Sequence, residues 1–585
     1  MIAPLSENMR TRLTLAAVGL VQGLVYYLAY EYWPDGLISR AIVVAVVFFV
    51  SGFVLIFQLS WTGRDVRRLV VLASVPPLVF SIIAIWVWLQ IPVGDVQYQF
   101  DDVRIPTSIA SAVLVVLLTI PFIQVYVKTG KRAYPYADLF NGFWNNLLVM
   151  AVGGVVIWAF WAVILLWSEL FKLIDITFFE DVFTDVAFVC MSLATVFGYA
   201  VALGKEWERL TTTSRSVLFI LLKALMPLLA VIALLFLASL PFTGLQPLWD
   251  TRHASATLLA LIGATILFFN GTYTDGTGDP PYSLWIRRLV AAALVAIPVY
   301  TAIAFLALYL RIEQYGLTFG RFYGVLFTSG GMLCGLGYAL AVLKRRGTWM
   351  ELVPRVNMAL VWVVIVFAVL VHTPLLDPLR WSARSQFRRL SDGIVNAREF
   401  DYGYLRFQLG HIGYETLGAI EELDDHPQAQ IISERIAVTR AAESYADVRP
   451  QPETLISASD IVTLDSTATL PDSLVRFVVT NLTQFEADDC EANRDCTMFP
   501  VNLDADEDAE YLLLLSGERN YSIVVFDRDE DGKWMRAGRL TRYDRRVRLP
   551  PRAALIATLR QDGVIAEETR YRDVIIGDHR LRVMR

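Results

Sequence analysis

The sequence predicts a polytopic α-helical membrane protein of about eleven transmembrane helices with a C-terminal α+β domain. Mean hydropathy is +0.49 and 55% of the 585 residues are hydrophobic, which is too apolar for a soluble protein. The charges are unevenly spread: residues 1–374 hold 24 basic and 20 acidic residues, whereas residues 375–585 hold 27 and 37. Stretches of about 20 apolar residues, long enough to cross a bilayer, recur only in the first part.

These observations predict three segments. Residues 1–376 form a transmembrane helical domain, residues 377–450 a helical membrane-proximal segment, and residues 451–585 a β-rich domain. The net charge of −6 and the lack of a basic face exclude a nucleic-acid-binding protein. The lipid bilayer is therefore the first expected partner, and the sequence does not indicate the oligomeric state.

Eleven stretches have the length and apolarity of membrane spans. They cover residues 13–30, 40–59, 69–92, 108–127, 143–168, 183–204, 216–241, 253–271, 285–310, 318–343 and 357–376. Basic residues concentrate in alternate loops, 17 in one set against six in the other. By the positive-inside rule the N-terminus is cytoplasmic, and the odd span number puts the C-terminal domain on the other side. In a bacterium this is an inner-membrane protein with a periplasmic domain.

Four prolines or proline pairs interrupt the predicted spans: Pro76–Pro77, Pro121, Pro227 and Pro298. Proline frees backbone carbonyls and bends helices, so these positions could line a cavity. The alternative, which the sequence favours, is a static kink packed by neighbouring helices.

Spans four to six resemble spans eight to ten. GYAVALGK (residues 198–205) ends the sixth span and GYALAVLK (residues 337–344) ends the tenth, and a Pro-Tyr pair precedes both the fifth and the ninth. Units four spans apart share one orientation, which predicts a parallel repeat about the membrane normal. Apolar helices also resemble one another by chance, so both interpretations stay open at this point.

Two cysteines lie close together in the acidic domain, in CEANRDC. A periplasmic location permits a disulfide between Cys490 and Cys496. The alternative is a metal site, but two thiols without a nearby histidine or a third cysteine make a poor zinc site. The sequence therefore predicts the disulfide.

Three motifs flank the last two spans. The first, YGLTFGR (residues 315–321), lies at the start of the tenth span, where Gly316 suits the turn and Thr318 the N-cap. The other two follow the eleventh span: DPLRWSARSQFRRL (377–390) and FDYGYLRFQLGHIGYETL (400–417). These motifs resemble a bacterial multi-spanning membrane family catalogued as domain of unknown function 4153, most closely over residues 180–420. The resemblance implies membrane placement and brings no catalytic residues.

Four arginines follow the last span at helical spacing: Arg380, Arg384, Arg388 and Arg389. They could contact lipid phosphates or pair with Asp401 and other acids of the following domain. The sequence favours local pairing.

The acidic domain divides at Pro450 and Pro452. Residues 385–446 are predicted to be helical. Beyond them, strands are predicted at residues 474–480, 510–515, 521–527, 533–540 and 573–578, and one helix at residues 551–561. Asp531–Gly532 is a hairpin-turn signal. Together these elements predict an antiparallel sheet with added helices.

One acidic turn is a weak calcium candidate. NLDADEDAE places Asn502, Asp504, Asp506 and Glu510 at alternating positions, as in oxygen-ligated calcium loops. The glycines that such loops use are missing, and a solvated turn is the alternative. Residues 486–510 hold ten acids, and residues 536–560 hold eight arginines, so pairing between these segments is expected to outweigh calcium binding. No other cofactor is predicted.

No catalytic or cofactor-binding residue can be assigned. HExxH, GxSxG and phosphate-binding loop motifs are missing, so enzyme activity is not favoured. Three classes remain, in this order: a non-enzymatic envelope sensing, docking or scaffold protein with an envelope protein partner; a transporter or lipid-handling protein with a cavity between the repeats; and a membrane-embedded transferase acting at the periplasmic face. Closed packing would favour the first, a polar midplane cavity the second, and an outer cleft with converging Arg, His and carboxylates the third.

Overall fold

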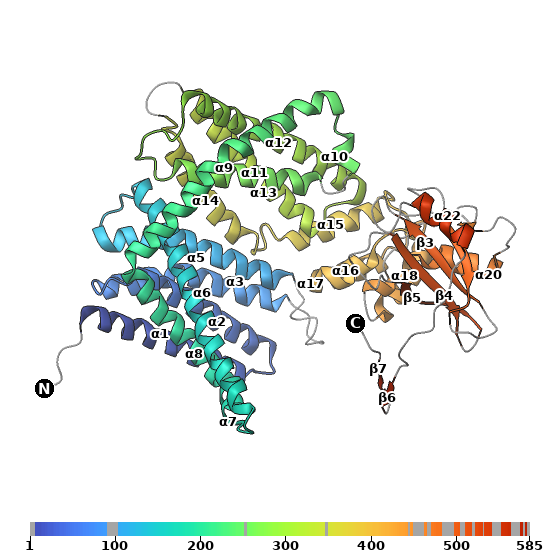
Figure 1. Ribbon diagram of the computed structural model, residues 1–585, viewed down its shortest axis with the longest axis horizontal. Helices are drawn as coiled ribbons and strands as arrows, with labels where there is room; N and C mark the ends of the chain where they lie inside the picture. The colour runs from blue at the N-terminus through green and yellow to red at the C-terminus, as the bar shows by residue number, and fades with distance from the viewer. Residues whose placement is uncertain are drawn as a thin grey trace. The chain divides into compact units, whose positions relative to one another are not determined.

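The computed structural model describes residues 6–90, 103–250, 254–344, 349–442, 445–448, 461–464, 470–482, 496–503, 509–516, 521–529, 532–540, 552–562, 574–576 and 579–581. The chain forms two compact units: Met1–Ala397 with Asp401–Val448, and Arg398–Phe400 with Arg449–Arg585. The first unit is helical and the second contains the sheet (Figure 1).

Eleven helices in the described ranges are long and apolar enough to cross a membrane, which confirms the predicted number. They are α1 (Glu7–Glu31), α2 (Leu37–Ser60), α3 (Val66–Leu89), α5 (Arg104–Thr129), α6 (Tyr136–Lys172), α8 (Val186–Glu206), α9 (Glu208–Thr243), α11 (Ala254–Tyr273), α12 (Leu284–Tyr315), α13 (Phe319–Leu343) and α14 (Val353–Leu370). Two short helices, α7 (Phe178–Thr184) and α10 (Gln246–Asp250), lie between spans.

Several spans exceed their predicted bounds. Helix α6 has 37 residues, about 55 Å at 1.5 Å per residue, against a hydrocarbon core of about 30 Å. Pro76, Pro77, Pro121, Pro227 and Pro298 lie inside helices that continue through them.

The spans form two groups of mutually contacting helices (Figure 1). Helices α1, α2, α3, α5, α6 and α8 make the first group, and α9, α11, α12, α13 and α14 the second; α14 contacts α5, and α6 contacts α9. Glycine permits the closest approach in the first group, because a Cβ on Gly19 of α1 would lie 2.1 Å from the Ala194 carbonyl oxygen of α8.

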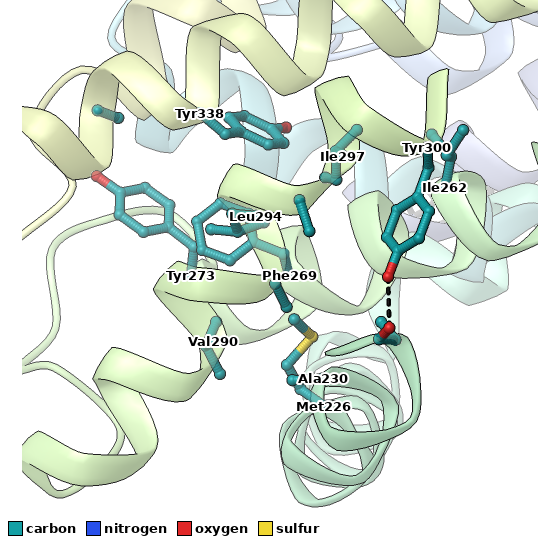
Figure 2. Packing of buried hydrophobic residues seen from close by; sticks show 14 of the residues in the cluster. Met226, Ala230, Ile262, Phe269, Tyr273, Val290, Leu294, Ile297, Tyr300 and Tyr338 are labelled. Atoms are coloured by element: carbon teal, nitrogen blue, oxygen red, sulfur yellow. Dashed lines mark hydrogen bonds between the residues drawn. The ribbon is translucent and has the colours of Figure 1, made fainter. Parts of the chain in front are cut away.

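The core of the second group is built from aromatic, aliphatic and alanine side chains (Figure 2). Tyr300 is fully buried, and its hydroxyl donates a hydrogen bond to the carbonyl oxygen of Ala233 across the helix contact. Next to this core a polar network joins four helices: the side-chain amide of Asn357 donates to Tyr136 and Asn270, and Tyr338 donates to Asn357. The network ties α6 of the first group to the second group.

The contacts of the two predicted repeats match in part. Helix α6 contacts α5 and α8, and α12 contacts α11 and α13. Gly198 of α8 packs against Leu15 of α1, and the matching Gly337 of α13 packs against Val356 of α14. These shared contacts do not establish that the two helix triplets superpose, so the parallel repeat stays a prediction.

Five shorter helices follow the last span and belong to the first unit. They are α15 (Pro378–Ser391), α16 (Tyr402–Gln408), α17 (Gly410–Glu421), α18 (Ala429–Ala441) and α19 (Tyr445–Val448), and together we call them the platform. Helix α15 contacts both α13 and α17, so the platform packs directly on the spans. Within the described part of residues 385–446, these helices confirm the helical prediction.

The second unit contains a mixed five-stranded sheet in the order β1-β2-β3-β4-β5. The strands are β1 (Ile461–Thr463), β2 (Cys496–Val501), β3 (Glu510–Ser516), β4 (Tyr521–Arg528) and β5 (Trp534–Leu540); β1 is parallel to β2 and the other pairs are antiparallel. A tight turn at Gly532, with φ +75°, joins β4 to β5 at the predicted hairpin position. Helix α22 (Arg552–Asp562) confirms the predicted helix, and β6 (Val574–Ile576) pairs with β7 (His579–Leu581).

The strand predicted at residues 474–480 is wrong, because this segment lies in helix α20 (Asp472–Asn481). Its β-branched residues suggested a strand, but Leu474 and Val478, one helical turn apart, are the fully buried pair. Pro471 directly before the helix and Asp472 in its first turn are helix-start signals. Strands β1 and β2 were not predicted from the sequence.

Candidate functional site

A small cavity with both polar and apolar walls lies where the spans meet the platform. It is lined at the end of α3 by Trp86 and Gln90, at the start of α5 by Arg104 and Thr107, at the start of α13 by Phe319 and Tyr323, and after α14 by His372 and Asp377. Its volume is about 20 Å³, which is room for about one water molecule. The cavity therefore brings together both groups of spans and the first platform helix.

Three ionisable side chains converge at this cavity. Arg104, His372 and Asp377 are each 6% exposed. The Arg104 guanidinium lies 3.6 Å from Asp377 Oδ2 and donates to the Gln90 carbonyl oxygen at 3.4 Å. A buried charge is strongly unfavourable unless it is paired, so this ion pair is a requirement of the local fold.

Asp377 has two roles. Its Oδ1 accepts the backbone N–H groups of Leu379 and Arg380 and caps α15, and Pro378 occupies the first helical position. Its Oδ2 faces Arg104 and, at 3.7 Å, Arg380. The start of α15 is thereby fixed to the start of α5.

His372 lies in the turn after α14, where its Nε2 is 2.9 Å from the Ser111 hydroxyl of α5. Burial lowers the pKa of His372 to about 4, and nearby Arg104 acts in the same direction, whereas Asp377 opposes both. The imidazole is therefore neutral at neutral pH. It serves as a hydrogen-bonding contact between α14 and α5.

Next to the cavity, platform side chains bind the backbone at the end of α12 and in the loop between α12 and α13. The Leu317 N–H donates to Ser385 Oγ at 2.9 Å, and Ser382 Oγ donates to the Leu317 carbonyl at 3.0 Å. Arg389 donates to the carbonyls of Glu313 and Gln314, each at 2.7 Å. These contacts join the second sequence motif to the first.

Tyr404 of α16 joins the third motif to the other two. Its hydroxyl accepts the Phe319 N–H at 3.0 Å and lies 2.9 Å from Ser382 Oγ. The Tyr404 amide in turn donates to the Asp401 carboxylate, which caps α16. The cavity and this hydrogen-bonded loop together form what we call the joint.

The loop has the predicted geometry. Gly316 has φ +76°, and Thr318 Oγ1 accepts the Arg321 N–H at the start of α13. A Cβ at Gly316 would lie 2.7 Å from atoms of Gln386 and Arg389, so α15 packs closely over this turn.

Two of the four predicted calcium residues, Asn502 and Glu510, lie within the described ranges. Asp504 and Asp506 lie outside the described residues, whereas Glu510 begins β3 opposite Val501 and accepts the Leu503 N–H. Among the described residues, no group of three or more His, Cys, Asp or Glu side chains is placed to hold a metal ion. Calcium binding at Asn502–Glu510 stays a prediction.

Of the two cysteines of the predicted disulfide, one lies within the described residues. Cys496 is buried at the start of β2, and Cys490 lies outside the described residues. Cys190 and Cys334, in α8 and α13, are free thiols. The Cys490–Cys496 bond also stays a prediction.

Sequence reasoning missed Arg104 as part of the site. The Asp-Pro pair at residues 377–378 is a recognisable helix start, so the capping role of Asp377 was within reach. Its ion-pair partner is 273 positions away, and no local pattern connects the two residues.

Over residues 16–423, more than two thirds of the chain, the sequence matches the family described as "Domain of unknown function (DUF4153)". The matched region contains the whole joint and all eleven spans, apart from the first residues of α1. No curated protein and no solved structure matches the chain.

Proposed function

Because this chain belongs to the DUF4153 family, whose description assigns no activity, we propose a function from the joint: a non-enzymatic docking, sensing or scaffold protein of the bacterial envelope. The membrane unit would hold the platform at the membrane surface, and the chain then continues into the sheet unit, which would meet an envelope protein partner. The closed packing of side chains in the joint supports this proposal.

The observation that carries this proposal is the size of the cavity. Arg104, His372 and Asp377 converge, as a transferase would require, but about 20 Å³ cannot hold a substrate beyond a water molecule. The Asp377 carboxylate is occupied by the cap of α15 and by two arginines. These side chains therefore suit the joining of helices better than acid–base chemistry.

We propose that the membrane is the inner membrane of a bacterium, with the N-terminus cytoplasmic and the sheet unit periplasmic. The alternating loop charges and the eleven spans support this orientation. A periplasmic sheet unit is also the setting in which a Cys490–Cys496 disulfide would form.

A complementation experiment tests the docking function. In a strain that lacks the gene, the full-length chain should restore the wild-type phenotype, and a chain ending after Val448 should not, although both reach the membrane at equal levels. The truncated chain keeps the eleven spans and the platform and loses the sheet unit. Restoration by the truncated chain would assign the activity to the membrane unit and contradict the proposal.

A further inference from the structure

Helix α15 lies across the ends of the spans. Near its start, the Arg380 guanidinium lies 5.7 Å from the centre of the Trp86 ring of α3. Near its end, Arg389 donates to the last residues of α12. Since α3 and α12 belong to different groups of spans, α15 runs along the membrane surface rather than away from it.

The chain between the last span and α15 is short. Helix α14 ends at Leu370 and α15 begins at Pro378. A turn held by the His372 and Thr373 amides, which donate to Val369 and Leu370, takes up part of this segment. The start of α15 is therefore at the level of the span ends, where lipid headgroups lie.

One face of α15 is covered and another is open. Leu379, Ser382, Ala383 and Leu390 are buried, on the side that meets α13 and α17. Trp381 is 47% exposed, and Arg384 and Arg388 are exposed on the same side, at i, i+3 and i+7. A tryptophan next to arginines is the composition of side chains at a membrane interface.

The expected local pairing holds for Arg380, and within the described residues none of the four arginines pairs with Asp401. Arg380 faces Asp377, and Arg389 binds backbone carbonyls. Asp401 accepts the Tyr404 N–H and, at 2.6 Å, the Tyr445 hydroxyl. Across the described parts of the chain, no carboxylate lies within 4 Å of the guanidinium of Arg384 or Arg388.

We propose that the face formed by Trp381, Arg384 and Arg388 binds the phosphate groups of anionic membrane lipids. The Cα atoms of the two arginines are about one helical turn apart, about 6 Å along the axis. Arginine presents a planar fork of N–H donors that matches phosphate oxygens. The exposed indole of Trp381 sits beside them at the boundary of the acyl chains, where amphipathic rings are stable.

Photolabelling of the full-length protein in bilayers tests this site. The probe is phosphatidylglycerol with a photoreactive diazirine in its headgroup, and the labelled residues are mapped by mass spectrometry. We expect label within residues 375–394. The double variant Arg384→Gln/Arg388→Gln should reduce this label by about 25-fold at sub-saturating probe, since each basic residue near an anionic surface contributes about fivefold.

A matched variant and the other labelled segments are the controls. Arg435→Gln/Arg440→Gln removes two charges from α18 and should leave the label at residues 375–394 unchanged. Label at segments remote from α15 should be equal in all variants, which reports an intact fold. The same diazirine in phosphatidylcholine should label α15 more weakly, and inorganic phosphate should not compete.

Three outcomes would overturn the proposal. The first is equal labelling of α15 in the Arg384→Gln/Arg388→Gln variant and the wild type. The second is an equal loss in the α18 variant, which would indicate a general charge effect. The third is competition by inorganic phosphate at millimolar concentration, which would indicate a free-anion site.

Discussion

Replacing Arg104 by methionine should destabilise the full-length protein by about 3–5 kcal/mol, the range observed when one partner of a buried ion pair is removed. Asp377 would keep its buried position, with 9% of its side chain exposed, and lose its closest cation. The remaining partner, Arg380, has a side chain that is 37% exposed, so water weakens its attraction. The free energy of unfolding, measured in mixed micelles, is the readout.

A double substitution separates charge from shape. Asp377→Asn keeps an oxygen that can cap α15 and removes the negative charge, so the Arg104→Met/Asp377→Asn protein should be more stable than Arg104→Met alone. Lys172→Met is the exposed control, because the Lys172–Glu180 pair is 49% and 35% exposed, and its effect should be much smaller. If Arg104→Met were no worse than Lys172→Met, the buried pair would not hold the joint.

Gly198→Ala should cost about 3 kcal/mol, at the upper end of the range for overpacking. A Cβ at this position would lie 2.2 Å from the Leu15 carbonyl oxygen, which is backbone and cannot rotate away. Helix α1 would have to move from α8, and the buried side chains around Leu15 and Val201 would lose contacts. The same unfolding measurement in mixed micelles applies.

Gly154→Ala is the matched control for this substitution. Gly154 is also a glycine inside a span, but a Cβ there would meet no atom within 4 Å. The control protein should be as stable as the wild type or slightly more stable, because alanine favours helix over glycine. Equal stability of the two variants would contradict the close contact between α1 and α8.

The spans were predictable because their signal is local. About 20 apolar residues suffice to define a membrane helix, and the eleven stretches correspond to eleven helices. Their ends were less predictable. Helix α6 continues to Lys172, past the predicted end at residue 168, and its last turn contacts α7, where Phe171 packs against Phe179 and Lys172 pairs with Glu180.

The three motifs were recognised separately, and the structure supplies what joins them. Gly316 and Thr318 have the turn and cap roles that local chemistry predicts. The hydrogen bonds that Ser385 and Tyr404 accept from the same loop depend on how the platform packs, and no short-range sequence pattern predicts that packing. The strand prediction for residues 474–480 was wrong for the opposite reason. The β-branched side chains there have a strong local preference for a strand, and the packing of Leu474 and Val478 in a helix overrode it.

The platform and the spans form one body at the joint, and hydrogen exchange of the loop between α12 and α13 tests this packing most directly. Among the described residues, the Leu317 and Phe319 amides donate to the platform side chains of Ser385 and Tyr404, so their protection reports the docked platform. In the full-length protein in micelles, both amides should exchange as slowly as those inside α13. Exchange at the rate of an open loop, with α12 and α13 still protected, would contradict the account.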